Sequence, residues 1–317
     1  MEQGELAEVA AKIVLKALYL ARLARPDILW TVNALARNVT KWTKACDKRL
    51  HRLISYLHFH SDWTQLCYMG DYTNDCWIAL FTDASFAGDL VDSKSTSGAY
   101  MCLVGPRTFV PITWLCKKQG AVSHSSSEAE VIALDASLRM EGLPALILWD
   151  IVITVFHTHT RTARSGNPSN TESTRHTIHE QLLNVDYIPC NLTTQNDLTK
   201  LIVFEDNQAV ITMTKKGRSP NMRHVPRTHR VNLDWIFERI REDKGVNIQY
   251  VGTKEQIADL LTKGSFTADQ WKTLTSLAQL GKFYDPPKIN KQTTVYVAAF
   301  ASSSCSDNQP VVIGTHC

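Results

Sequence analysis

The chain has 317 residues, of which 44% are hydrophobic and 21% charged, and its formal net charge is +3. This composition is typical of a globular protein with a sizeable core. The net charge is too small to indicate nucleic-acid binding by itself, and no apolar run is long enough to span a bilayer, so we expect no membrane partner.

Eight cysteines occur along the chain, and none forms a C-x-x-C pair: they are Cys46, Cys67, Cys76, Cys102, Cys116, Cys190, Cys305 and Cys317. A zinc site is therefore not supported by spacing. No secretory signal opens the sequence. We expect free thiols in a reducing compartment, such as a cytoplasmic particle or the nucleus.

The first 72 residues have the apolar periodicity of helices, which is expected at residues 5–23, 27–39 and 44–59. Pro26 separates the first two, and a polar turn at residues 70–74 ends the section. We expect a small helical section there.

Short apolar runs then predict three strands of an antiparallel meander, at residues 76–82, 98–104 and 109–116. Helices are expected from the serines at 125–127 to residue 139 and over residues 143–155. Residues 157–198 are rich in Thr, Ser, Asn and His, and we expect an inserted, disordered surface loop.

Regular strands and helices are expected again after the insert. The predicted strands lie at residues 201–205 and 246–251, and the predicted helices at 207–213, 229–241, 255–263 and 267–280. The tail from residue 282 is polar and Ser-rich apart from a strand-like segment at 294–301. We assign this tail no function.

Four acidic residues sit where strands or helices are expected to meet an open edge of the sheet: Asp83, Glu130, Asp206 and Asp259. Ligand sites in open α/β sheets cluster at the carboxyl ends of strands. Taken singly, an acidic residue just past a strand is more often a turn former or a helix cap. Glu128, three residues after Ser125, fits a capping box and is expected to be structural.

The joint context favours a catalytic site. The blocks FTDASFAG, KSTSG, ITWLCKKQ, SSSEAEVIA, FEDNQAVI and QIADLLTK occur in this order within residues 76–264. Together they resemble the ribonuclease H domain of copia-type retrotransposon polyproteins. That resemblance implies a ribonuclease H fold, a mixed five-stranded sheet flanked by helices.

The resemblance also implies a two-metal site. By motif, Asp83, Glu130, Asp206 and Asp259 would hold two Mg²⁺ ions, with Mn²⁺ as a possible substitute. Close carboxylates repel one another, and such a cluster is hard to explain unless it binds metal. Many cellular ribonucleases H carry a histidine in the loop before the last aspartate, but VGTKEQIA has none. A proton-shuttling histidine is therefore not expected there.

The helical section resembles the end of copia-type reverse transcriptase, through ALYLARLARPDILWTVNALAR and KRLHRLISYL. The polymerase palm with its Y-x-D-D site is absent, so we expect a fragment or decayed copy of a polyprotein whose remainder is a partner. The expected division is a helical section at 1–72, a ribonuclease H-like domain at 75–265 and a helix with a polar tail at 266–317.

A basic link lies between the third carboxylate and the last predicted strand, and its cations are Lys215, Lys216, Arg218, Arg223, Arg227 and Arg230. The link is either a solvated connection or an arm that contacts the phosphates of an RNA–DNA hybrid; its position favours the arm. His224 and His229 lie in the same stretch, one residue closer together than the pair typical of the family. We expect neither to be a metal ligand.

The sequence leaves three hypotheses of function. The first is an endonuclease that degrades the RNA strand of RNA–DNA hybrids during reverse transcription. The second is a non-catalytic nucleic-acid-binding remnant, favoured by the long insert and the missing palm. The third is a DNA-directed nuclease of the same fold, such as an integrase, against which the KSTSG and KKQ blocks argue.

Overall fold

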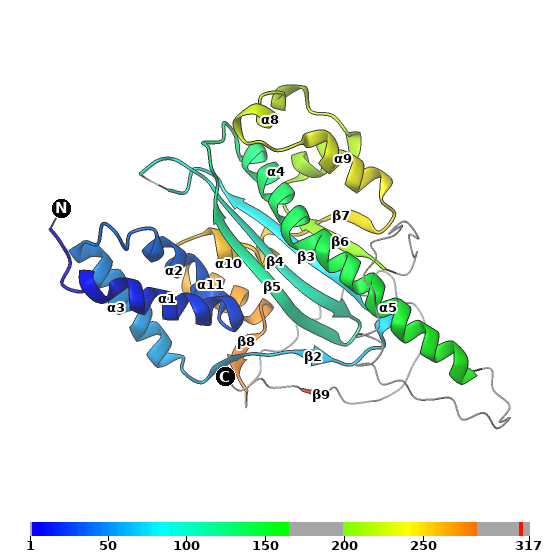
Figure 1. Ribbon diagram of the computed structural model, residues 1–317, viewed down its shortest axis with the longest axis horizontal. Coiled ribbons are helices and arrows are strands. Elements are labelled where there is room, and N and C mark those ends of the chain that lie inside the picture. The colour runs from blue at the N-terminus through cyan, green and yellow to red at the C-terminus, as the bar shows by residue number, and fades with distance from the viewer. Residues whose placement is uncertain (1, 90, 165–198, 284–310, 313–317) are drawn as a thin grey trace, which may run out of the picture.

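A computed structural model describes residues 2–89, 91–164, 199–283 and 311–312. Its centre is a mixed sheet with the strand order β7-β6-β3-β4-β5-β2-β9 (Figure 1). The strands are β2 (Tyr68–Met69), β3 (Trp77–Ser85), β4 (Thr96–Gly105), β5 (Thr108–Lys118), β6 (Leu201–Glu205), β7 (Val246–Tyr250) and β9 (Val311–Val312). The predicted meander β3-β4-β5 is confirmed, and β6 and β7 join β3 in parallel. The short strands β2 and β9 beyond β5 were not predicted, so the sheet has seven strands rather than the five expected.

Successive side chains of a strand point to opposite sides of the sheet, and here helices bury both faces. On β3, Ile78 and Leu80 join the hydrophobic cluster of one face, whereas Ala79 and Phe81 join that of the other. The first face packs against α4 (Ser126–Ser137), α5 (Leu143–Arg164), α7 (Gln208–Lys216) and α9 (Leu233–Glu242). The second cluster includes residues of α1 (Ala7–Leu23), α2 (Leu29–Ala36), α3 (Lys44–Phe59), α10 (Asp259–Thr262) and α11 (Ala268–Leu277). A mixed sheet flanked by helices was therefore correctly predicted.

The helix predicted at residues 255–263 is wrong over its first half. A short 3₁₀ turn, η5 (Thr253–Glu255), is followed by extended backbone at Gln256, and α10 begins only at Asp259. The side-chain amide of Gln256 is buried and donates a hydrogen bond of 2.8 Å to the carbonyl of Thr82. This tertiary contact holds the chain out of the helix that its periodicity favours.

The helix predicted from residue 229 begins only at Leu233. Arg230 has a left-handed backbone with φ of 58°, and the Asn232 side chain caps the helix by accepting from the backbone N–H of Trp235. Within the basic link the chain forms two short turns, η4 (Pro220–Met222) and α8 (Val225–Thr228). The link is thus folded against the body rather than an open loop.

Two further predictions concern the insert and the front section. Helix α5 continues to Arg164, so the loop expected from residue 157 is helical in its first part, and residues 165–198 lie outside the described residues, as does the segment 294–301. The front section is not all helical, because β1 (Trp63–Gln65) pairs with β8 (Leu280–Lys282). Among the described residues, no helix is both long and apolar enough to cross a membrane.

A buried ion pair organises the helical section. Arg25 donates two hydrogen bonds to the carboxylate of Asp27, at 2.9 and 2.7 Å, and a third to the carbonyl of His60. The hydroxyl of Tyr56 donates to the same carboxylate at 2.8 Å, and the guanidinium lies 5.9 Å from the ring centre of Trp63. The RPD sequence thus joins the start of α2 to the end of α3 and to β1.

We expect Asp27→Ala to destabilise the protein by about 3–5 kcal/mol, because it leaves the Arg25 guanidinium buried without its partner. Lys44→Ala is the matched control: it removes an exposed ion pair with Glu2, whose loss costs about 1 kcal/mol or less. Urea unfolding of both variants measures the difference. Equal stability of the two variants would show that the buried pair does not hold this section together.

Candidate active site

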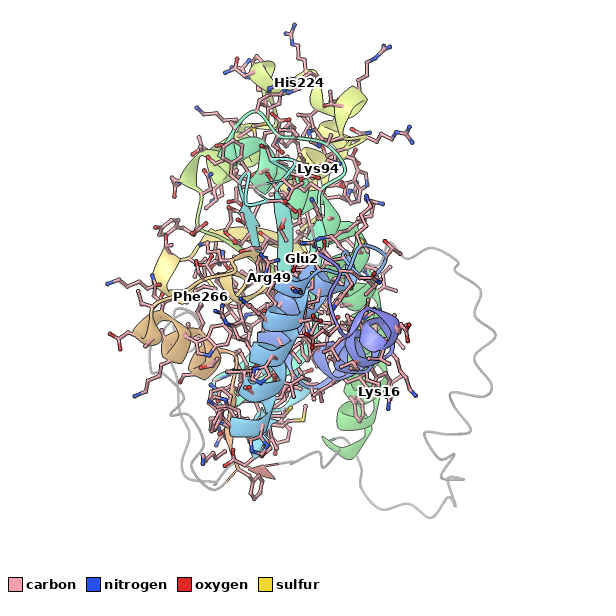
Figure 2. The ribbon with its side chains drawn as sticks, turned by 90° about the vertical axis from the view of Figure 1, so that its left-hand side faces the viewer. Glu2, Lys16, Arg49, Lys94, His224 and Phe266 are labelled. Atoms are coloured by element: carbon pink, nitrogen blue, oxygen red, sulfur yellow. The ribbon has the colours of Figure 1, made fainter. Side chains whose placement is uncertain are left out.

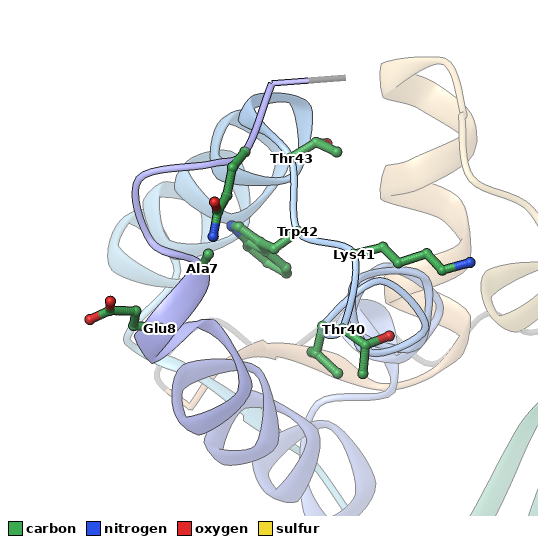
Figure 3. A pocket seen from close by; sticks show the side chains of 8 residues that line it. Ala7, Glu8, Thr40, Lys41, Trp42 and Thr43 are labelled. Carbon is green, nitrogen blue, oxygen red and sulfur yellow. The ribbon is translucent and has the colours of Figure 1, made fainter.

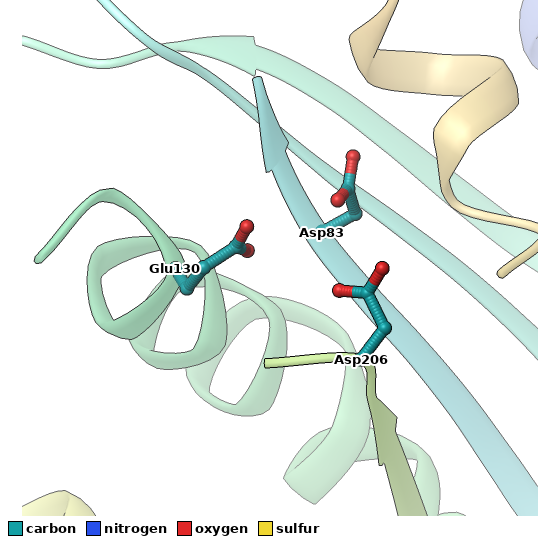
Figure 4. A group of neighbouring side chains, drawn as sticks. All are labelled: Asp83, Glu130 and Asp206. Carbon is teal, nitrogen blue, oxygen red and sulfur yellow. The ribbon is translucent and has the colours of Figure 1, made fainter. Parts of the chain in front are cut away.

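Three of the four predicted carboxylates meet at one edge of the sheet (Figure 4). The parallel register of β3 and β6 pairs Phe81 with Phe204, so Asp83 and Asp206, each two residues further on, come side by side. Helix α4 packs on β3 and β4 and brings Glu130 to the same place. One carboxylate oxygen from each residue lies within 4.8 Å of the other two. No second such group of three His, Cys, Asp or Glu side chains is present in the described part of the chain.

The fourth predicted carboxylate, Asp259, lies beside this group but not within it. Its neighbour in α10, Thr262, donates a hydrogen bond to Asp83, while Lys263 donates to Asp259 at 2.5 Å. Gly98 of the KSTSG block makes this possible: a Cβ there would lie 2.5 Å from the methyl group of Thr262. The glycine is therefore needed for α10 to approach β4, which faces Asp83 across the sheet.

A fifth carboxylate, Glu205, escaped the sequence analysis. Its side chain is fully buried at the end of β6, where it accepts hydrogen bonds from the hydroxyl of Thr82 (3.0 Å) and the backbone N–H of Asn207 (3.1 Å). The sequence signal that could have identified it is the pair of adjacent acids, Glu205 and Asp206, in the block FED. The motif placed Asp206 in the site and left Glu205 without a role, although its charge acts on Glu130.

Burial and mutual repulsion raise the pKa values of this cluster. The pKa of Asp83 is raised to about 7, mainly by burial and then by the charge of Asp259. Burial raises the pKa of Glu205 to about 8. The pKa of Glu130 is raised further, by burial and then by the charges of Glu205 and Asp83. Burial also raises the pKa of Asp259, against the lowering effect of Lys263.

This donor set suits a hard divalent cation. Oε2 of Glu130 is buried and has no hydrogen-bond partner within the described part of the chain. An ionised oxygen left in this state is costly unless a cation neutralises it. Carboxylate oxygens in this arrangement are ligands that Mg²⁺ accepts. The residues present therefore fit a magnesium site.

The expected cap at Glu128 is confirmed in part, and the residue has a second role. Its backbone N–H donates to the hydroxyl of Ser125, while its carboxylate accepts from the backbone N–H of His124. The same carboxylate lies 3.2 Å from Nε2 of His224 and 3.0 Å from Nε2 of His229. These histidines flank α8, so Glu128 fastens the basic link to the helix that carries Glu130.

The basic link is exposed above this contact, around His224 at the top of Figure 2. All six of its predicted cations are exposed, and none forms an ion pair with another described residue: Lys215, Lys216, Arg218, Arg223, Arg227 and Arg230. Their charges are therefore available to a ligand. These six side chains are not part of the carboxylate cluster.

A hollow at the far end of the helical section offers no comparable chemistry (Figure 3). Its lining contains one acid, Glu8, and one amine, Lys41, besides polar and apolar side chains around Trp42. None of the predicted site residues lines it. One carboxylate cannot assemble a metal site, so the sheet edge remains the candidate active site.

The chain has recognisable relatives, although no protein-family model matches it. It is 36% identical over 130 residues to the retrovirus-related Pol polyprotein from transposon RE1 of Arabidopsis thaliana, which is 41% of this chain and 8% of that protein. It is 24% identical over 265 residues to the corresponding polyprotein from transposon TNT 1-94 of Nicotiana tabacum, which is 83% of this chain and 16% of that protein. The chain is thus homologous to a small part of retrovirus-related Pol polyproteins from plant transposons.

A shorter relative is matched over most of its length. The chain is 30% identical over 119 residues to Secreted RxLR effector protein 161 of Plasmopara viticola, which is 37% of this chain and 78% of that protein. The chain belongs to the same family as this protein. The Pol polyproteins are longer relatives that contain a matching segment.

We expect the metal-free protein to lose stability as the pH rises from about 5 to 8. The folded-state pKa values of Asp83 and Glu205 are raised, so their contribution is present below the ordinary carboxyl pKa and is lost as the pH passes the raised values near 7 and 8. Asp83→Asn should flatten this dependence, and at pH 8 it should raise the stability. Chemical unfolding in EDTA at several pH values measures both effects.

The exposed aspartate of α9 provides the control, because Asp234→Asn makes the same change outside the cluster. Its pH dependence should follow that of the wild type. Wild-type stability that is constant or rises between pH 5 and 8 would contradict the repulsion assigned to these carboxylates.

Proposed function

We propose that this chain is a ribonuclease H-type endonuclease from a copia-type retrotransposon Pol polyprotein, and that it hydrolyses the RNA strand of RNA–DNA hybrids. The observation that carries the proposal is the convergence of Asp83, Glu130 and Asp206, from three elements far apart in sequence, within 4.8 Å. The mixed sheet with helices on both faces is compatible with a ribonuclease H-like fold. The homology to Pol polyproteins agrees with this origin.

Asp83, Glu130, Asp206 and Asp259 would hold Mg²⁺, with two ions as the family resemblance implies, or Mn²⁺ in their place. Bound metal would supply an activated water and stabilise the leaving oxyanion of the phosphodiester. The chain contributes the orientation of the ligands. Thr262 fixes Asp83 by hydrogen bonding, and Lys263 does the same for Asp259.

The basic link is proposed to position the hybrid through its phosphates. Exposed arginines and lysines bind the backbone without regard to sequence. The contact of Glu128 with His224 and His229 fixes the link to α4, so that a bound phosphate would lie at a set distance from Glu130. The remainder of the reverse transcriptase polyprotein is the proposed protein partner.

The alternative is a nucleic-acid-binding remnant without activity. It predicts the same basic link but no need for a complete acidic cluster. Here all four predicted carboxylates are present, three of them within 4.8 Å, and Asp83 and Asp259 keep their hydrogen-bond partners. This arrangement favours the enzyme.

We expect the purified chain to cleave the RNA strand of a labelled RNA–DNA hybrid with Mg²⁺ and not with EDTA. Asp206→Asn should lower the rate by roughly 100-fold or more, because it removes a ligand charge at the metal centre. Asp234→Asn, an exposed change of the same kind, should leave the rate unaltered. Hybrid binding without any cleavage would favour the remnant, and preferred cleavage of duplex DNA would favour a DNA-directed nuclease.

The proposed phosphate contacts of the basic link are tested by a double variant, Arg223→Ala with Arg227→Ala. Because phosphate contacts carry no sequence information, this double variant should weaken binding equally for two hybrids of unrelated sequence. Cleavage at saturating hybrid should change much less than affinity, since the carboxylates are untouched. Unchanged affinity would show that the basic link does not contact the hybrid, and a loss of affinity confined to one hybrid would indicate base recognition instead.

A further inference from the structure

A groove leads from the candidate active site onto the helical section. It consists of two adjoining hollows that share Trp30 and Gly264 in their lining. Lys263, which donates to Asp259, lines the first hollow, while Arg49 and Arg52 of α3 line the second. The groove therefore begins at Lys263, next to the carboxylate of Asp259, and ends at two arginines that the sequence analysis did not single out.

The floor of the groove is fixed by a close contact. A Cβ at Gly264 would lie 2.1 Å from the indole ring of Trp30, so a larger residue there would push the ring of Trp30 away from the segment after α10. Trp30 is half-buried, which leaves part of its ring facing the groove. The active-site end and the helical section are thus held in one relative position.

The charged side chains in the groove lining that form no ion pair with a described residue are cationic. Arg49 and Arg52 are exposed and form no ion pair with any other described residue. The acid in the lining, Asp27, is buried and already bonded to Arg25 and Tyr56.

The carboxylates therefore lie between two cationic surfaces. The basic link is fastened by His224 and His229 to α4, the helix of Glu130. The groove starts on the other side, at Lys263. A polyanion that crosses the carboxylates from the basic link would continue into this groove.

We propose that the groove binds the phosphodiester backbone of the nucleic-acid strand where it leaves the active site. The proposal rests on the proposed function, because it places the same substrate on a second surface. Arg49 and Arg52 contact phosphates, and the Trp30 ring offers an apolar face to a sugar or base. The helical section is thus part of the substrate-binding surface.

The test measures the affinity of a fluorescent RNA–DNA hybrid at several salt concentrations, in EDTA so that no cleavage occurs. The logarithm of affinity falls with the logarithm of salt by about 0.7–0.9 per phosphate contact. Arg49→Ala with Arg52→Ala should therefore reduce this slope by roughly 1.5. Lys12→Ala with Lys16→Ala is the matched control, because it removes the same charge from exposed positions of α1 outside the groove.

The outcomes separate the groove from the proposed function. A lower slope in the arginine variant alone, with a higher KM and an unchanged kcat for cleavage in Mg²⁺, supports the groove. If the wild type cleaves hybrid but both double variants keep its slope, or both lose it equally, the groove is wrong and the nuclease stands. A wild type that neither binds nor cleaves hybrid overturns both. Equal melting temperatures show that the variants are folded, and Arg49→Lys with Arg52→Lys should retain the slope.

Discussion

The repulsion among buried carboxylates is the constraint on which the rest of this structure depends. Asp83, Glu130 and Asp206 are held within 4.8 Å, and Glu205 adds a fifth acid beside them and Asp259. Such a cluster opposes folding in proportion to its ionisation. The surrounding fold offsets this cost with hydrogen bonds from Thr82 and Thr262 and with extensive burial of the sheet on both faces.

The same constraint links the outer parts of the chain. Lys263 places a cation next to Asp259 and also opens the groove toward the helical section. Glu128, two residues before Glu130, holds the histidines of the basic link. Each flank of the acidic centre is therefore connected to a positively charged surface through a residue within four positions of a candidate ligand. The proposed polyanionic substrate would contact both surfaces.

Much of this arrangement could be predicted where local patterns agree with the tertiary structure. The strand Leu201–Glu205 was predicted at its observed bounds, because its four consecutive apolar residues indicate a buried strand. The prediction failed where a side chain reached across the fold: Gln256 breaks the expected helix by bonding to Thr82. Glu205 was missed because the motif assigned the site role to its neighbour Asp206, and its burial against Thr82 is a tertiary contact. The pairing of β1 with β8 joins segments more than 200 residues apart, which no local pattern reveals.

The most direct measurement of the central claim is the melting temperature during a Mg²⁺ titration at pH 8, without nucleic acid. A cation that binds the folded state alone stabilises it in proportion to the logarithm of its concentration above Kd. We expect a rising melting temperature for the wild type and a much smaller rise for Glu130→Gln. A wild-type melting temperature that does not respond to Mg²⁺, or an equal rise in both proteins, would contradict a metal site at these carboxylates.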